Sequence, residues 1–471
     1  MTIPAGVSDP AEAVVTRAGE WFSPTLMMDV ELTEPLPAVR DDGEHERAWV
    51  LARLHTEPVG VCVARLGRAG LDPDQLGALL WAEVREPVRQ RFAAAGLPVP
   101  GSLTGDGLVA DPAVWPFLRD RRAVLAAPPS ISVIVPTRGR PERLPTWLEC
   151  LRRLEYPRFE VVVVDNAPAN DDLRAHVEAA RGDAAHHGAA PGGVVLRYVR
   201  EPRVGTSWAA NAGVAASAGD IITFCADDGE PDRHWLTGLA RGFARGDDVG
   251  CVTGMVLPAR LDTPAQELYE QFGGYRKGRG FSPAIFSRHG PQSPVYPVPP
   301  FGTGACVAYR RDALERIGGF DVALGPGTPA RAAEDLLAMS LVLLAGYRLA
   351  YEPAALMRHD HRRDLDGLRR QMEGYGVGLT AYYAALLRHR PGVLPELIRL
   401  MPTGLGYLRR RNNFRRTTAP LDLLAGLKRR HRQSMLTGPV AYVRSVRRQA
   451  RLTADQARSD RTPGPRPRTR S

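Results

Sequence analysis

Lysine and cysteine are both scarce in this chain of 471 residues. All but two of its 62 basic residues are arginine, and together with the many alanine, glycine and proline residues this bias is typical of a GC-rich bacterial genome such as that of an actinobacterium. The five cysteines are scattered and form no CxxC pair. Their number and spacing exclude a disulfide framework and a zinc site, and indicate reduced thiols in a cytosol.

Long apolar runs are also missing from the chain. No run reaches the roughly 18 residues that a membrane-spanning helix needs. The first residues lack the basic-then-apolar pattern of a signal peptide. We therefore expect a cytoplasmic protein.

The net charge of +10 at pH 7 has a local origin. Residues 421–471 hold 13 basic and three acidic residues, so the rest of the chain is near neutral. Basic residues at near-helical spacing, with leucine, valine and tyrosine between them, suit a segment that lies on an anionic membrane surface. A solvated tail is the simple alternative, and nucleic acid is the least favoured partner.

One predicted strand ends at two adjacent acids. The apolar run that begins at Ile221 stops at Asp227 and Asp228. Ligands bind at the carboxyl ends of strands in parallel α/β sheets, and a divalent cation with a phosphorylated ligand would relieve the repulsion between neighbouring carboxylates. A solvated turn is the alternative, because Gly229 and Pro231 follow.

Two further predicted strands also end in polar residues. One runs into Asp165, and the other runs into Pro136, Thr137 and Arg138. A helical segment near residues 144–154 connects them, which is typical of a βαβ unit with parallel strands. Three polar strand ends at one edge predict an α/β fold with a nucleotide-phosphate site.

These motifs, taken in order, resemble the inverting glycosyltransferases of family two. The resemblance covers about residues 130–365, and its six motifs are Pro136-Thr137-Arg138, Asp165, Glu201 to Gly213, Asp227-Asp228, Phe301 to Asp321, and Glu334-Asp335. It implies the GT-A fold, a Rossmann-like nucleotide-sugar domain with a mainly parallel central sheet. It also implies transfer of a sugar from a nucleoside-diphosphate sugar to an acceptor hydroxyl, lipid-linked or on a glycan, with Mn²⁺ or Mg²⁺ as cofactor.

The resemblance assigns roles to individual residues. The implied nucleotide-sugar site consists of Pro136, Thr137, Arg138, Asp165, Arg203, Asn211 and Asp227. Asp165 would accept a hydrogen bond from the base, and Asp227 would contact the ribose. Asp228 matches the acid that holds the metal ion. Asp335 matches the catalytic base, with Glu334 beside it.

Two positions depart from the family pattern. Ala226 stands where the family often has a third acid, and Ala210 where it often has an arginine. A nucleotide-sugar-binding or scaffold protein with a decayed site is therefore the alternative function. A nucleotidyltransferase would need a glycine-rich loop with a lysine after the first strand, and residues 137–141 are too short and contain no lysine.

Glu334 and Asp335 precede an apolar helical run, so they could simply complement the positive end of a helix. The turn-rich stretch 325–329 before them favours a substrate-facing loop instead. A carboxylate at such a place can take the acceptor's proton as a general base. Both acids are therefore catalytic candidates, Asp335 first.

A late pair of histidines offers a further metal ligand. His359 and His361 flank Asp360, and histidine is a common ligand of divalent metals. A polar loop after a strand is the alternative. The sequence does not decide between the two histidines.

The chain is expected to divide into an N-terminal α+β extension (1–128), the GT-A domain (129–367), a helical region (368–454) and a disordered basic tail (455–471). Two strands at 49–54 and 59–66 and a helix at 76–92 make up the extension. In the helical region, Pro391 and Pro395 are expected to break the helices. Residues 273–300 are expected to face the acceptor.

Overall fold

The structure is a computed structural model, and it describes residues 22–108, 115–186, 195–275, 279–295, 301–409 and 420–459. Arg276 and Lys277 of the expected acceptor segment, and residues 460–471 of the expected tail, lie outside the described residues.

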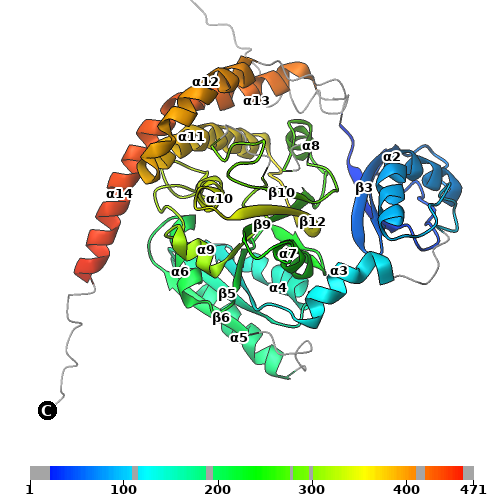
Figure 1. The fold of residues 1–471 in the computed structure, drawn as a ribbon, viewed down its shortest axis with the longest axis horizontal. Coiled ribbons are helices and arrows are strands. Elements are labelled where there is room, and N and C mark those ends of the chain that lie inside the picture. The colour runs from blue at the N-terminus through cyan, green and yellow to red at the C-terminus, as the bar shows by residue number, and fades with distance from the viewer. Residues whose placement is uncertain are drawn as a thin grey trace, which may run out of the picture.

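A central sheet lies between layers of helices (Figure 1). It has nine strands in the order β10-β12-β9-β11-β7-β4-β5-β6, with β8 beside β12. Four parallel strands make up one half, namely β4 (Ile131–Thr137), β5 (Phe159–Asn166), β6 (Val195–Glu201) and β7 (Ile221–Phe224). The four consecutive valines of β5, Val161 to Val164, are fully buried. β-branched runs of this kind are typical of central strands with helices on both faces.

The other half of the sheet is mixed. It contains β8 (Gly229–Pro231), β9 (Val249–Pro258), β10 (Ala284–Phe286), β11 (Val307–Arg310) and β12 (Arg348–His359). β11 runs antiparallel to both β7 and β9, whereas β12 runs parallel to β9. The sheet is therefore mainly parallel where the nucleotide-sugar motifs lie, and the α/β GT-A fold predicted from the sequence is confirmed.

Helices cover both faces of the sheet. The core of one face includes side chains from α3 (Trp115–Ala126), α4 (Leu144–Arg152), α5 (Asp172–His186) and α7 (Trp235–Phe243). The core of the other includes side chains from α6 (Thr206–Ala216), α9 (Arg311–Arg316) and α10 (Glu334–Leu344). Because the crossovers pass over these faces, the carboxyl ends of β4, β5 and β7 meet at one edge.

The predicted N-terminal elements are present, together with one strand that the sequence did not indicate. β2 (Arg47–Leu54) and β3 (Glu57–Arg65) pair as a hairpin, β1 (Thr25–Glu31) adds a parallel strand, and α2 (Pro73–Ala94) covers one face. Trp49 and Leu51 on the other face pack against Leu257 and Leu356. The N-terminal sheet is thus packed directly against β9 and β12.

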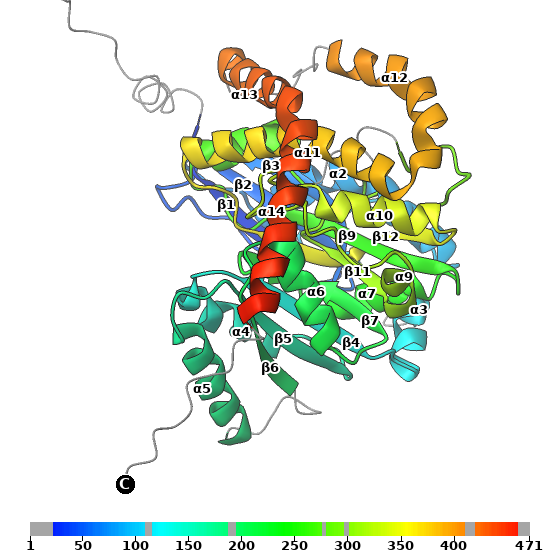
Figure 2. The ribbon, with the colours of Figure 1, turned by 90° about the vertical axis from the view of Figure 1, so that its left-hand side faces the viewer.

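A helical layer follows the sheet (Figure 2). It consists of α11 (Leu365–His389), α12 (Leu394–Arg409), α13 (Leu421–Ser434) and α14 (Gly438–Ser459), and α11 packs against both α13 and α14. The short 3-10 turns Pro391–Val393 and Met435–Thr437 join α11 to α12 and α13 to α14. In the described part of the chain, no helix combines the length and the apolar character needed to cross a membrane.

Two sequence expectations need correction here. Pro395 does not break a helix, because it occupies the first turn of α12, where its missing N–H is not needed. The break lies at Pro391 instead. The helical region also extends past residue 454, since α14 continues to Ser459.

Candidate active site

A cavity of about 840 Å³ opens at the carboxyl ends of β4 and β7. Thr137 of β4 and the acids Asp227 and Asp228 after β7 form its floor, and Glu334 and Asp335 at the start of α10 line it as well. Pro136, Arg138 and His359 contribute further lining side chains. Most of the residues that the sequence singled out therefore come together in one place.

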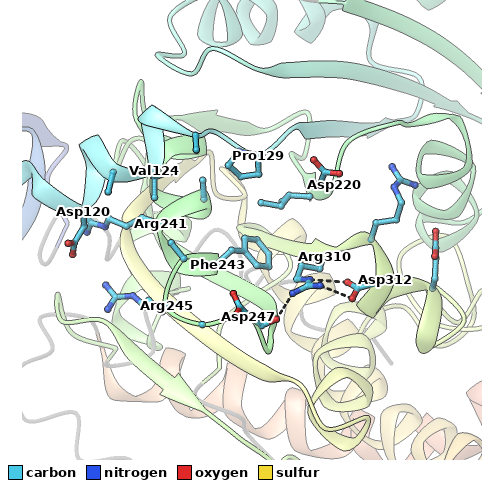
Figure 3. Close-up of a pocket in the computed structure, with 18 residues that line it drawn as sticks. Asp120, Val124, Pro129, Asp220, Arg241, Phe243, Arg245, Asp247, Arg310 and Asp312 are labelled. Atoms are coloured by element: carbon cyan, nitrogen blue, oxygen red, sulfur yellow. Dashed lines mark hydrogen bonds and ion pairs between the residues drawn. The ribbon is translucent and has the colours of Figure 1, made fainter.

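A second cavity, of about 970 Å³, lies at the opposite edge of the sheet, next to the first residue of β7 (Figure 3). Three of its arginines already have protein partners. The guanidinium of Arg310 pairs with Asp312 at 2.9 Å, and those of Arg241 and Arg245 pair with the buried Glu352 at 2.8 and 2.6 Å. The catalytic candidates are all at the other edge.

Asp227 is held by the side chains of Thr137, at the end of β4, and Arg140, in the loop after it. Thr137 donates from Oγ1 to one carboxylate oxygen at 2.8 Å, and Arg140 donates from Nη1 to the other at 2.9 Å. Burial raises the pKa of Asp227, and the cation of Arg140 opposes that rise. Asp227, whose charge Arg140 balances only in part, can accept hydrogen bonds from ligand hydroxyl groups.

Asp228 is more deeply enclosed and more strongly compensated. Its Oδ1 lies 3.3 Å from Nε2 of His359, and its Oδ2 lies 3.8 Å from Nη1 of Arg140. Burial opposes ionisation, but the hydrogen bond and charge of His359 outweigh it and hold the pKa of Asp228 well below its usual range. Asp228 is thus a carboxylate that stays ionised.

The donor atoms of Asp228 and His359 fit a divalent cation. Carboxylate oxygen and imidazole nitrogen are both ligands of Mn²⁺, and two protein ligands leave coordination positions for phosphate oxygens. Within the described ranges, no three acidic, histidine or cysteine side chains are grouped closely enough to hold a metal by themselves. A metal at this site would take its remaining ligands from phosphate oxygens or water.

The structure distinguishes the two late histidines. The side chain of His359 lines the cavity, whereas that of His361 is buried behind it, with Nε2 at 2.9 Å from Glu270 of α8 (Pro264–Gln271). Only His359 contacts Asp228. His359 is therefore the better placed of the two for metal binding.

Glu334 and Asp335 enter the cavity from an unusual backbone turn. Ala333 just before α10 has a left-handed φ of 79°, a conformation that residues other than glycine rarely adopt. Asp335 accepts hydrogen bonds from the N–H groups of Gly304, at 2.5 Å, and Leu336, at 2.8 Å. Burial and the neighbouring charge of Asp335 raise the pKa of Glu334. The surroundings of Glu334 therefore favour its neutral form, whereas the carboxylate of Asp335 has backbone donors.

Three predicted nucleotide-contacting residues do not line the cavity, and each has a protein partner. Asp165 is buried and accepts a hydrogen bond from Tyr198 at 2.9 Å. Asn211 exchanges two hydrogen bonds with the backbone of Phe320, both at 2.9 Å. Arg203 pairs with Glu201 at 2.7 Å.

The guanidinium of Arg203 also stacks on Trp208 at 3.6 Å, and the indole of Trp208 donates to Gln449 of α14 at 2.7 Å. Trp208 thus joins α6 to α14.

Several lining residues were not found from the sequence. Arg331 comes from the loop before α10, Arg362 follows the end of β12, and Gln371 and Tyr375 come from α11. Nothing in the local pattern marks them, because α11 reaches the site only through tertiary packing. The glycines of α11 are the sequence feature that could have indicated this packing. A Cβ added to Gly378 would lie 2.7 Å from the side chain of Ala332.

The domain that holds these acids also matches a known family in sequence comparison. Residues 132–318 match the sequence model described as glycosyl transferase family 2. Residues 132–318 thus form a domain of the family-two glycosyltransferase type.

Curated relatives carry related names. The chain is 28% identical over 293 residues to the pre-mycofactocin glycosyltransferase of Mycobacterium tuberculosis, covering 60% of this chain and 54% of that protein. It is 30% identical over 210 residues to the O-antigen biosynthesis protein RfbC of Myxococcus xanthus, covering 41% of this chain and 15% of that protein. The chain therefore spans about half the length of the first relative, and far less of the second.

Among solved structures, the chain is similar to the mannosyltransferase PcManGT of Pyrobaculum calidifontis in complex with GDP-Man and Mn²⁺. That similarity has a TM-score of 0.41 and 19% identity, and it covers 71% of this chain and 81% of that one. TarS of S. aureus, solved in complex with UDP-GlcNAc, gives a TM-score of 0.37 at 16% identity, over 66% of this chain and 91% of that one.

The raised pKa of Glu334 predicts a pH-dependent cost in stability. A carboxyl group with a raised pKa in the folded state contributes stability that is fully present below its unfolded pKa and is lost as the pH rises through its folded pKa. Glu334→Gln cannot ionise, so it should lose less unfolding free energy than the wild type between about pH 5 and about pH 9. Urea unfolding at both pH values measures this. Glu178→Gln on exposed α5 is the control, and equal losses in wild type and Glu334→Gln would contradict the assignment.

Proposed function

We propose that this protein is a metal-dependent, inverting glycosyltransferase that moves a sugar from a nucleoside-diphosphate sugar to an acceptor hydroxyl. The observation that carries the proposal is the presence of two kinds of acid in one cavity. Asp228 with His359 forms a cation-binding pair, and Asp335 is a charged carboxylate supported by backbone donors. Transfer to a hydroxyl requires both a cation that balances the charge of the departing diphosphate and a base that takes the proton of the hydroxyl.

On the acceptor side, Asp335 takes the proton of the attacking hydroxyl. The N–H groups of Gly304 and Leu336 fix the orientation of its carboxylate before substrate arrives. Glu334 remains protonated beside it and does not compete for that proton. Attack from the face opposite the departing diphosphate inverts the anomeric carbon in one displacement.

On the donor side, Asp228 and His359 would hold Mn²⁺ or Mg²⁺, which when bound neutralises the charge of the departing diphosphate. Asp227 accepts hydrogen bonds from the ribose, and Thr137 keeps its carboxylate in place. The nucleotide-sugar contacts that the resemblance implies for Asp165, Arg203 and Asn211 stay predictions, since these side chains do not line the cavity.

Arginines offer a substitute for the missing family arginine at position 210. Ala210 and Ala226 both line the cavity, as do Arg138, Arg140, Arg331 and Arg362. Planar guanidinium groups bind phosphate oxygens well. Loss of one family arginine therefore leaves the diphosphate site with positive charge.

Asp335→Asn tests the catalytic role. The substitution should leave the affinity for the donor nearly unchanged and lower the rate of transfer by about 10²- to 10⁴-fold, because the amide cannot take a proton. Calorimetry measures donor binding, and release of nucleoside diphosphate in the presence of acceptor measures turnover. Glu334→Gln is the matched neighbour and should keep most of the rate. An active Asp335→Asn with an inactive Glu334→Gln would show that Glu334 is the base instead. A wild-type protein that binds the donor but never turns it over would indicate a binding protein with a decayed site.

We also propose that the basic C-terminal helices contact an anionic membrane at its inner face. Leu436 in the turn before α14 is 84% exposed, and Val440 and Val443 at the start of α14 are 53 and 48% exposed. Arg444, Arg447 and Arg451 continue this exposed face of the helix. An exposed apolar strip with arginines beside it suits the boundary between headgroups and acyl chains.

Surface substitutions test this contact better than truncation, because α13 and α14 pack on α11. A variant with Arg444, Arg447 and Arg451 all changed to glutamine should sediment less with vesicles that contain phosphatidylglycerol, since each basic residue near an anionic surface contributes about 1 kcal/mol. The control changes two exposed arginines of α2, Arg85 and Arg89, to glutamine. Equal, salt-insensitive sedimentation of all three proteins would leave the helices without this role.

A further inference from the structure

Four side chains form a continuous hydrogen-bonded row behind the cavity floor. Nε2 of His359 lies 3.3 Å from Asp228, Nδ1 of His359 lies 3.3 Å from Nδ1 of His361, and Nε2 of His361 lies 2.9 Å from Oε1 of Glu270. The side chain of His361 is only 1% exposed, and that of Glu270 is 23% exposed. The row thus joins α8 to the carboxylate that would hold the metal.

The direction of the hydrogen bonds follows from the last member. An ionised carboxylate only accepts, so Nε2 of His361 carries the proton that is donated to Glu270. In a neutral imidazole, the other nitrogen then accepts, and Nδ1 of His359 must donate to it. Nε2 of His359 is then the nitrogen that faces Asp228, where a cation can replace the proton of its hydrogen bond to Asp228. A cation between the two atoms satisfies both.

The surrounding structure makes room for Glu270 and fixes His361. Gly274 has a left-handed φ of 49°, and a Cβ there would lie 2.3 Å from the carboxylate oxygen of Glu270. Tyr269 of the same helix packs edge-on against the ring of His361, with 4.7 Å between ring centroids. Gln266 of α8 donates to the carbonyl of His361 at 3.4 Å. Tyr269 and Gln266 therefore hold the position of His361. The Glu270 carboxylate adds the acceptor that decides which nitrogen of His361 carries the proton.

We propose that Glu270 and His361 are positioning residues that fix the tautomer and orientation of His359 for metal binding. This inference rests on the proposed function. Partners of this kind typically change metal affinity by about 10- to 100-fold when they are removed. They do so without touching the metal or the substrate.

Glu270→Met tests the proposal, because methionine keeps the length of the side chain and loses the acceptor. Calorimetry would measure the binding of UDP and of GDP to the full chain, once with Mn²⁺ and once with EDTA. We expect Glu270→Met to weaken binding in Mn²⁺ by about 10- to 100-fold and to leave binding in EDTA unchanged. Glu270→Gln retains an acceptor oxygen and should recover part of the loss.

Glu267→Gln is the matched control on the same helix, because Glu267 pairs with Gln271 and Arg47 and does not contact His361. Equal weakening of Glu270→Met in Mn²⁺ and in EDTA would indicate a purely structural role and overturn the proposal. Unchanged binding in Mn²⁺ would overturn it as well. A wild type whose nucleotide binding ignores Mn²⁺ would overturn the proposed metal dependence, and this inference with it.

A second measurement needs no variant. Long-range ¹H–¹⁵N spectra of the metal-free wild-type protein report which nitrogen of each histidine carries a proton. We expect His361 to be protonated at Nε2 alone and His359 to be protonated at Nδ1. A His361 protonated at Nδ1 would reverse the row and contradict the proposal, even if Glu270→Met did not fold.

Discussion

The site depends on keeping one enclosed carboxylate charged. Asp228 lies at a strand end where only 10% of its side chain is exposed, next to a second acid. Ionisation under these conditions is costly unless cations are close. His359 from the end of β12 and Arg140 from the loop after β4 provide them. Because the two come from distant parts of the chain, the sheet must be complete before the site exists.

The same principle separates the two catalytic candidates at the start of α10. Glu334 and Asp335 are adjacent, and both cannot easily be charged in a confined space. Backbone donors favour the charge on Asp335, and burial favours the proton on Glu334. A pair of identical functional groups thus acquires two roles from its surroundings. The left-handed backbone at Ala333 is the local cost of this placement.

The sequence was sufficient for the parts of the molecule that local pattern determines. β4, β5 and β7 were visible as apolar runs, and the polar residues after them marked one sheet edge. Asp227, Asp228, Glu334 and Asp335 do meet in one cavity, as the fold required.

Contacts between distant elements were not predictable in this way. Arg331, Arg362 and the residues of α11 carry no local signal, and their place in the site follows from packing between distant segments. The choice between His359 and His361 likewise depends on Glu270, which lies 91 residues from His361 in the chain. Asn211 and Arg203 matched family positions, but a sequence pattern does not reveal that Phe320 and Glu201 are their partners in the folded chain.

The central claim is that Asp228 binds a metal ion together with a nucleoside diphosphate, and calorimetry of the wild type and of Asp228→Ala tests it most directly. With UDP or GDP as ligand, the account predicts that Mn²⁺ strengthens binding to the wild type at least about tenfold and has no effect on Asp228→Ala. The ligand-free melting temperature of the variant should fall slightly, since the contacts of the ionised Asp228 with His359 and Arg140 are lost. Binding that responds equally to Mn²⁺ in both proteins would contradict the account.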